Sequence, residues 1–129
     1  MPCQSILIVE DEASIRENLK MMLELAGYSS IFTANDGKQG LETLKTLPHP
    51  CLVLLDQLMP VMNGMEFLEA KRHEDAIAAI PVCIVSGVAQ QPTSKNLYEH
   101  FLKKPIDLTT LLSFVRLYCG EPNPKEAAS

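Results

Sequence analysis

A set of polar residues follows short apolar runs of the chain. The set contains three carboxylates, one hydroxyl and one ammonium group: Glu10, Asp11, Asp56, Ser86 and Lys104. Carboxylates held close together repel one another unless a cation joins them, and an oxygen-only ligand set suits Mg²⁺. An aspartate can also act as a nucleophile toward a phosphoryl group. The combination therefore indicates phosphoryl transfer, in which a cation, an ammonium and a hydroxyl surround the transferred group.

The runs that precede these residues have the pattern of strands, and helical patterns separate them. Strands are predicted over residues 5–9, 29–34, 51–55, 81–85 and 101–103, and helices over 12–26, 37–47, 64–72 and 108–118. Gly27 is expected to end the first helix and Asp107 to cap the last one. Strands that alternate with helices predict an α/β, doubly wound fold with a five-stranded parallel sheet. Such folds bind ligands beyond the carboxyl ends of the strands, where the polar set is expected.

The size, composition and charge of the chain exclude several classes of protein. The 129 residues fit one domain, and 47% of them are hydrophobic, which is enough for a core. The net charge is −5 and the acidic residues are scattered, which argues against direct binding of nucleic acid. The apolar run Ile6–Val9 is too short for a signal peptide or a membrane span. We therefore expect a cytoplasmic protein without membrane insertion.

The four cysteines show no spacing that points to a metal site. They are Cys3, Cys51, Cys83 and Cys119, and no CxxC pair occurs among them. Disulfides and a zinc site are the alternatives, but buried reduced thiols are expected.

Four segments together resemble the receiver domains of response regulators in two-component signalling. They are residues 6–12 (ILIVEDE), 54–64 (LLDQLMPVMNG), 84–87 (IVSG) and 102–105 (LKKP), in the family's order. The resemblance extends over residues 5–118 and implies a sheet with the strand order 2-1-3-4-5. Residues 1–120 would then form the phosphoacceptor domain, and residues 121–129 a flexible tail or linker stub.

The resemblance assigns a role to each member of the acidic set. Asp56 matches the aspartate that is phosphorylated. Glu10 and Asp11 match the acidic pair that binds Mg²⁺ (or Mn²⁺) together with Asp56, Asp11 directly and Glu10 mostly through water, and the backbone carbonyl of Leu58 would be a further ligand. Glu12 is read as a residue at the start of a helix, where the helix dipole favours negative charge.

The resemblance also assigns the residues around the phosphoryl group. Ser86 and Lys104 match the hydroxyl and the ammonium that contact its oxygens, and Pro105 would follow a cis peptide bond. Ser86 and Phe101 match the pair that switches position on phosphorylation, although Phe101 could also be a plain core residue. The implied partners are a histidine kinase or a histidine phosphotransfer protein and an unknown downstream protein. Such a domain catalyses only its own phosphorylation and dephosphorylation.

The chain departs from the family pattern between Ser86 and Lys104. These two residues are eighteen positions apart, which is fewer than is usual in the family. Pro92 cannot lie inside a helix without the loss of a hydrogen bond, so that a helix is expected to begin near Thr93. The fourth helix of the fold is therefore predicted to be about one turn short.

Two other functions compete with this interpretation. A haloacid-dehalogenase-like phosphatase also uses Asp, Mg²⁺, Ser or Thr, and Lys on a doubly wound sheet. It would carry a second carboxylate two residues after the nucleophile, where this chain has Leu58. A receiver-shaped module that works without phosphorylation usually lacks the acceptor or the lysine, and this chain has both.

Overall fold

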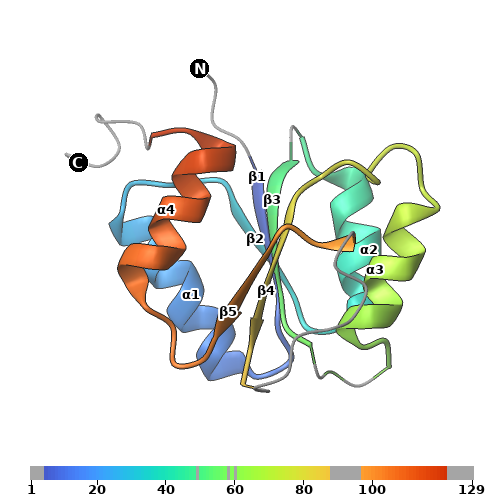
Figure 1. The fold of residues 1–129 in the computed structure, drawn as a ribbon, viewed down its shortest axis with the longest axis horizontal. Helices are drawn as coiled ribbons and strands as arrows, with labels where there is room; N and C mark the ends of the chain where they lie inside the picture. Colours follow the sequence, from blue (N-terminus) through green and yellow to red (C-terminus); the bar gives the residue numbers. More distant parts are fainter. Residues whose placement is uncertain (1–4, 49, 58, 60, 88–96, 122–129) are drawn as a thin grey trace.

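Five parallel strands form the sheet of the computed structural model, which describes residues 5–48, 50–57, 59, 61–87 and 97–121 (Figure 1). The strands are β1 (Ser5–Val9), β2 (Ile31–Ala34), β3 (Pro50–Leu55), β4 (Val82–Ser86) and β5 (His100–Lys103). Their order is β2-β1-β3-β4-β5, which confirms the predicted fold and strand order. The direction of winding reverses between β1 and β3, and doubly wound folds bind ligands at this switch point.

Two layers of helices cover the two faces of the sheet (Figure 1). The helices are α1 (Ala13–Leu25), α2 (Gly37–Thr46), α3 (Gly64–Arg72) and α4 (Leu108–Cys119). Ile6 and Ile8 of β1 belong to the apolar cluster that contains residues of α1 and α4. Leu7 and Val9 belong to the cluster on the other face, with residues of α2 and α3. Successive side chains of β1 therefore enter opposite layers, which explains why its run is apolar without interruption.

The ends of the elements follow the local signals that the sequence carries. Gly27 has a φ of 104° directly after the C-cap of α1, and the side chain of Asp107 accepts a hydrogen bond of 3.3 Å from the Thr110 N–H at the start of α4. Both predicted helix ends are confirmed. The strand β2 begins two residues later than predicted, because its ladder with β1 begins at the pair Ile6↔Ile31.

Two expectations fall on parts of the chain that lie outside the described residues. The shortened fourth helix belongs to the segment between β4 and β5, of which residues 88–96 are not described. Residues 122–129 of the predicted tail also lie outside the described residues, so that the division between residues 1–120 and 121–129 stays a prediction. Among the described helices, none is both long and apolar enough to cross a membrane.

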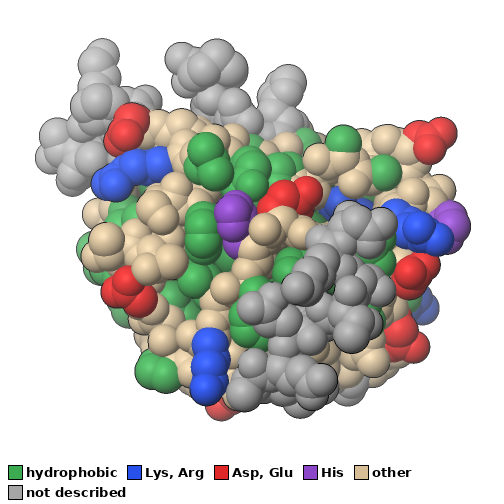
Figure 2. All heavy atoms as spheres, in the orientation of Figure 1, with side chains coloured by type: hydrophobic (Ala, Val, Ile, Leu, Met, Phe, Trp, Pro, Cys, Tyr) green, Lys and Arg blue, Asp and Glu red, His purple; other side chains and the backbone are tan. Residues whose placement is uncertain are grey.

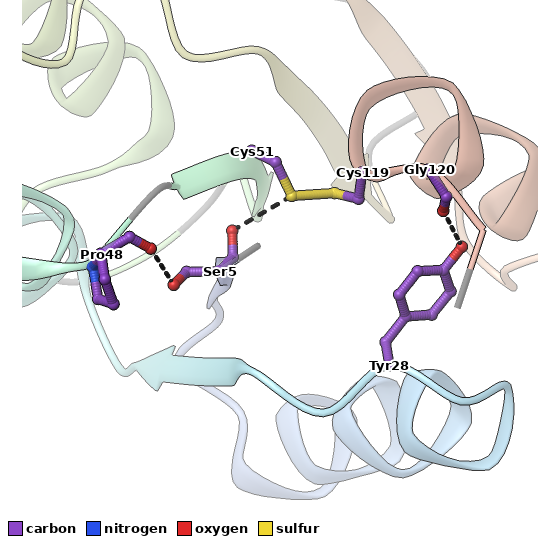
Figure 3. The surroundings of a disulfide bond; sticks show 6 residues. All are labelled: Ser5, Tyr28, Pro48, Cys51, Cys119 and Gly120. Atoms are coloured by element: carbon purple, nitrogen blue, oxygen red, sulfur yellow. Dashed lines mark hydrogen bonds between the residues drawn. A yellow bond between two sulfur atoms is a disulfide. The ribbon is translucent and has the colours of Figure 1, made fainter. Parts of the chain in front are cut away.

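The prediction that the cysteines are reduced thiols is wrong for two of them. Cys51, at the start of β3, and Cys119, the last residue of α4, form a disulfide with a Cα–Cα distance of 5.5 Å (Figure 3). The two residues are 68 positions apart in the sequence, and only the packing of α4 on the sheet brings them together. Cys83 is a buried free thiol as predicted, with its pKa raised to about 12 by burial. Cys3 lies outside the described residues.

A lysine is buried in the layer formed by α2 and α3. Lys71 is only 4% exposed, and its Nζ donates a 2.9 Å hydrogen bond to the carbonyl oxygen of Ala78. Burial lowers the pKa of Lys71, and the charge of Glu99 offsets part of that effect. The ammonium thus fixes the turn that follows α3, a role that the sequence does not reveal.

Candidate functional site

The carboxyl ends of the strands bring the predicted acidic residues together. Glu10 and Asp11 follow β1, and Asp56 follows β3, the neighbouring strand in the sheet. One carboxylate oxygen from each of the three residues lies within 4.8 Å of the others. Glu10 and Asp56 are buried, whereas Asp11 is exposed. Glu12 is not a member of this group and instead forms the N-cap of α1, in agreement with its predicted place at a helix start.

Lys104 lies between two of these carboxylates. Its Nζ donates a 2.9 Å hydrogen bond to Oε1 of Glu10 and lies 3.6 Å from Oδ1 of Asp56. The Lys104 side chain is 20% exposed, against 4% for Glu10 and 9% for Asp56. Because all three groups are withdrawn from water, the attraction between them is stronger than that of a surface ion pair.

Backbone hydrogen bonds fix these residues to the sheet. The Asp56 N–H donates to the Val9 carbonyl at 2.9 Å, and the Lys104 N–H donates to the Ser86 carbonyl at 2.8 Å. The second bond places the main chains of Ser86 and Lys104 side by side, and Ser86 itself is only 1% exposed. The bond between Lys104 and Pro105 is cis, as predicted.

Burial controls the charge states of the acidic residues. Burial raises the pKa of Glu10; the hydrogen bond from Lys104 acts in the opposite direction, and the charge of Asp56 adds to the rise. Burial also raises the pKa of Asp56, which the charge of Lys104 lowers in part. The pKa of Lys104 is lowered by burial but raised more by its hydrogen bond to Glu10 and by the charge of Asp56, so that the net shift is upward. The site therefore holds one firmly charged ammonium beside carboxylates that ionise at a cost.

Arg16 is a member of the site that sequence reasoning missed. Its Nη1 donates a 2.8 Å hydrogen bond to the main-chain carbonyl oxygen of Glu10 and lies 3.4 Å from that of Asp11. The guanidinium therefore holds the segment that carries both carboxylates against the first turn of α1. A basic residue one turn into a helix that follows acidic residues was the available signal, although such residues are common on solvated helix faces.

The start of α3 is packed closely behind Asp56. Asn63 and Glu66 form a reciprocal capping box at the start of α3, with two hydrogen bonds of 2.9 Å. The Gly64 N–H donates to the Gln57 carbonyl at 3.0 Å. A Cβ atom at Gly64 would lie 2.8 Å from the carbonyl oxygen of Asp56, which is closer than van der Waals contact allows. Leu58 and Pro60 lie outside the described residues, so that the carbonyl ligand expected from Leu58 stays a prediction.

Replacing Gly64 with alanine should therefore disturb the acceptor. The added methyl group must displace the main chain of Asp56 and Gln57, and we expect a loss of about 1–3 kcal/mol in the free energy of unfolding. The measurement is urea denaturation, with the rate of phosphorylation as a second readout. Gly87→Ala is the matched control, because no described atom lies within 4 Å of a Cβ placed at Gly87. Equal stability of the two variants would contradict the tight packing at Gly64.

Phe101 lies in β5, opposite Ile84 of β4. It is half-buried and packs against the apolar cluster that contains residues of α2 and α3. This position is compatible with a movable aromatic ring and with a core residue, so that its role as a switch stays a prediction.

The acidic group fits a hard divalent cation. Glu10, Asp11 and Asp56 each offer a carboxylate oxygen, and the group contains neither histidine nor cysteine. Mg²⁺ prefers such oxygen ligands and tolerates few of them from protein, since it keeps several waters. The cation would also relieve the repulsion between carboxylates whose pKa values burial already raises.

Comparison with known proteins identifies the family. The response regulator receiver domain model matches residues 6–116. A probable transcriptional regulator, ycf27 of Cyanophora paradoxa, is 35% identical over 88% of this chain, which spans only 47% of that protein. The chemotaxis protein CheY4 of Vibrio cholerae has a TM-score of 0.79 at 28% identity, over 91% of this chain and 99% of its own. TrrA of Thermotoga maritima, solved in complex with Mg²⁺ and BeF, has a TM-score of 0.78 at 26% identity, over 89% of this chain and 98% of its own.

The chain thus spans about half the length of the curated ycf27 relatives that it matches, and nearly the whole of the structural neighbours CheY4 and TrrA. The match of the family model covers the sheet, the acidic group and Lys104. The chain belongs to the response regulator receiver domains of two-component signalling.

Proposed function

We propose that Asp56 accepts a phosphoryl group from the phosphohistidine of a histidine kinase or a histidine phosphotransfer protein. The observation that carries this proposal is the position of Lys104, whose Nζ lies 2.9 Å from Glu10 and 3.6 Å from Asp56. An ammonium beside a buried aspartate at the carboxyl edge of the sheet can neutralise the charge of an incoming phosphoryl group. The phosphodonor and the transfer itself are inferred from membership of the family.

The chain's own residues have separate tasks in this reaction. The Asp56 carboxylate attacks the phosphorus atom, and its ionised form is required because only that form is a nucleophile. Lys104 keeps Asp56 ionised against the effect of burial and contacts a phosphoryl oxygen. Ser86, one strand away, supplies a hydroxyl to another oxygen.

The same geometry supports Mg²⁺ (or Mn²⁺) as the cofactor. Glu10, Asp11 and Asp56 would hold the ion, with the backbone carbonyl of Leu58 as a further ligand, and the TrrA complex with Mg²⁺ supports this choice. When bound, the ion offsets the negative charge of the carboxylates and of the phosphoryl oxygens.

The output is a change of protein contacts. Phosphorylation draws Ser86 toward the phosphoryl group, Phe101 follows, and the surface beside β4 and β5 binds a downstream protein. The domain resets itself by dephosphorylation and turns over no other substrate. On the face drawn in Figure 2, Lys and Arg side chains are scattered among acidic ones, which supports an output without direct nucleic-acid contact. The proposed setting is the cytoplasm.

The proposal is tested by intact mass after incubation with Mg²⁺ and acetyl phosphate. We expect a single phosphoryl adduct that disappears in Asp56→Asn and in the presence of EDTA, because the variant lacks the nucleophile and EDTA removes the cation. Asp75→Asn is the matched control, since Asp75 is an exposed aspartate on the turn after α3. It should be phosphorylated like the wild type.

Other outcomes would favour the competing functions. An adduct that survives in Asp56→Asn would place the acceptor elsewhere. Steady hydrolysis of a small phosphate ester would indicate a phosphatase. Absence of both the adduct and Mg²⁺ binding would indicate a receiver-shaped module that works without phosphorylation.

A further inference from the structure

The disulfide lies at the amino ends of the strands, whereas the candidate site lies at their carboxyl ends. Cys51 is the second residue of β3, and Asp56 follows the last residue of the same strand. A strand rises about 3.3 Å per residue, so that roughly 17 Å separates the two positions. The bond joins the amino end of β3 to the end of α4, where Gly120 is the C-cap (Figure 3). Its direct effect therefore falls on the C-terminal end of α4.

The two cysteine residues differ in their exposure to solvent. Cys51 is 5% exposed, whereas Cys119 is half-buried at the end of its helix. The third described cysteine, Cys83, has no partner cysteine, and burial raises its thiol pKa to about 12. A thiol with such a pKa is a poor nucleophile at neutral pH. Thiol exchange can therefore enter at Cys119, while Cys83 stays inert.

The surroundings of the bond accommodate both redox states. Sγ of Cys51 lies 3.4 Å from the carbonyl oxygen of Ser5, which can accept a hydrogen bond from the thiol once the disulfide is broken (Figure 3). The Tyr28 hydroxyl donates a 2.8 Å hydrogen bond to the carbonyl oxygen of Gly120. This second contact keeps the end of α4 near the sheet without help from the sulfur atoms. The reduced cysteines thus stay close enough to be oxidised again.

We propose that Cys51 and Cys119 form a reversible redox site that locks the C-terminal end of α4 to β3. The inference rests on the proposed function, because that function places the domain in the cytoplasm, where disulfides are mostly transient and redox-sensing. The oxidised chain holds the end of α4 through the covalent bond, the Tyr28 contact, the hydrogen bond between Tyr118 and His100 and packing, and the reduced chain lacks only the covalent bond. The lock adjusts the mobility of α4 and leaves the chemistry of Asp56 unchanged.

Opening requires a dithiol reductant. One thiolate of the reductant attacks Sγ of Cys119, and Cys51 leaves as a thiolate that takes up a proton. The second thiol of the reductant then attacks the mixed disulfide, releases Cys119 and leaves the reductant as a disulfide. Two electrons and two protons thus pass from the reductant to the cysteine pair.

Closing requires a peroxide or a disulfide oxidant. A peroxide converts the more accessible Cys119 to a sulfenic acid and is itself reduced, to water in the case of hydrogen peroxide. The Cys51 thiolate then attacks the sulfenic sulfur and expels hydroxide, which takes up the proton that Cys51 has lost to form a second water. The cysteine pair loses two electrons in all.

The first test is peptide mapping under native conditions. Protein treated with hydrogen peroxide should yield a linked peptide that contains Cys51 and Cys119, and dithiothreitol should abolish it without unfolding the domain. Alkylation of the reduced protein should reach Cys119 before Cys83. Absence of the linked peptide, or a bond that yields to dithiothreitol only after denaturation, would overturn the proposal.

The second test measures the lock itself. Reduction should lower the Tm by about 10 °C in the wild type, since a crosslink between residues so far apart restricts the unfolded chain strongly. The same treatment should leave the Tm of Cys119→Ser unchanged, whereas the control Cys83→Ser should still respond. Amide hydrogen exchange in the last turn of α4 should be faster in the reduced wild type. Equal Tm values and equal exchange in the two redox states would exclude a lock.

The phosphorylation assay separates this proposal from the proposed function. The oxidised and the reduced protein should form the acetyl phosphate adduct at equal rates, because the disulfide lies at the opposite ends of the strands from Asp56. A difference between the two states would contradict the confinement of the lock to α4. Failure of the adduct in both states would count against the proposed function and, with it, the cytoplasmic setting, while the mapping and Tm results would still decide whether the bond is reversible.

Discussion

Replacing Lys104 with methionine should destabilise the metal-free domain by about 2–3 kcal/mol at neutral pH. The variant leaves Glu10 and Asp56 buried without the ammonium that contacts them at 2.9 Å and 3.6 Å. Removal of one partner from a fully buried pair costs roughly 3–5 kcal/mol. The expected loss is smaller here because the Lys104 side chain is 20% exposed and water screens part of the interaction. Urea denaturation in the presence of EDTA measures the change.

The destabilisation of Lys104→Met should depend on pH. Burial already raises the pKa of Glu10 and of Asp56, and loss of the ammonium raises both further. When the pKa of a carboxyl group is higher in the folded than in the unfolded state, the free energy of unfolding of the domain falls as the pH rises from the unfolded pKa toward the folded pKa. The variant should therefore approach the wild type at acid pH, where both carboxyls are protonated, and differ most at neutral pH.

Lys103→Met is the matched control for Lys104→Met. Lys103 is the neighbouring lysine, but it is exposed, and no described ion pair contains it. We expect the free energy of unfolding of Lys103→Met to stay within about 0.5 kcal/mol of the wild-type value. Phosphorylation should also slow by roughly a hundredfold or more in the Lys104 variant alone, since it lacks a preorganised positive charge. If the two variants behave alike, Lys104 does not have the role assigned to it.

Addition of Mg²⁺ should stabilise the wild-type domain by about 2.7 kcal/mol when the ion is present at a hundred times its dissociation constant. The ion binds the folded chain, in which the oxygen atoms of Glu10, Asp11 and Asp56 lie within 4.8 Å of one another, and not the unfolded chain, in which they are apart. Thermal unfolding with and without Mg²⁺ measures the effect. Asp11→Asn and Asp56→Asn should reduce it strongly, and the exposed control Asp75→Asn should retain it.

The stabilisation by Mg²⁺ should grow as the pH rises. Protons compete with the ion for Glu10 and Asp56, and the raised pKa values of these groups extend that competition above the usual range of carboxylates. The rise in Tm should therefore be small near pH 4 and larger near pH 7. An increase that is the same in the double variant Asp11→Asn/Asp56→Asn would place the ion elsewhere on the protein.

Much of the candidate site could be predicted, because its residues lie where strands end. Each member of the polar set lies within two residues of the carboxyl end of a strand: Glu10, Asp11, Asp56, Ser86 and Lys104. The carboxyl ends of parallel strands share one edge of the sheet, so that the order of elements was enough to bring them together. No tertiary detail was required for this inference, and the wholly apolar run of β3 identified the central strand.

Other features could not be predicted, because they depend on contacts between elements that the sequence does not pair. Cys51 and Cys119 meet only because the end of α4 packs beside the start of β3. Arg16 donates its hydrogen bond to the main-chain carbonyl oxygen of Glu10. Every residue type has such a carbonyl group, so that the side chain at position 10 does not reveal the contact. Gly64 must be a glycine only because the Asp56 carbonyl approaches it, a distance that no local pattern encodes.

The buried Lys71 has a practical consequence for chemical labelling. Reagents that acylate amines require an accessible, neutral nitrogen, and the Nζ of Lys71 is sealed in the core by its bond to Ala78. Burial lowers the pKa of Lys71, and the opening that exposes the amine also removes that shift, so that the exposed amine reacts like the other lysines. The domain therefore carries a built-in reporter: the labelled fraction of Lys71 records how often the layer of α2 and α3 opens.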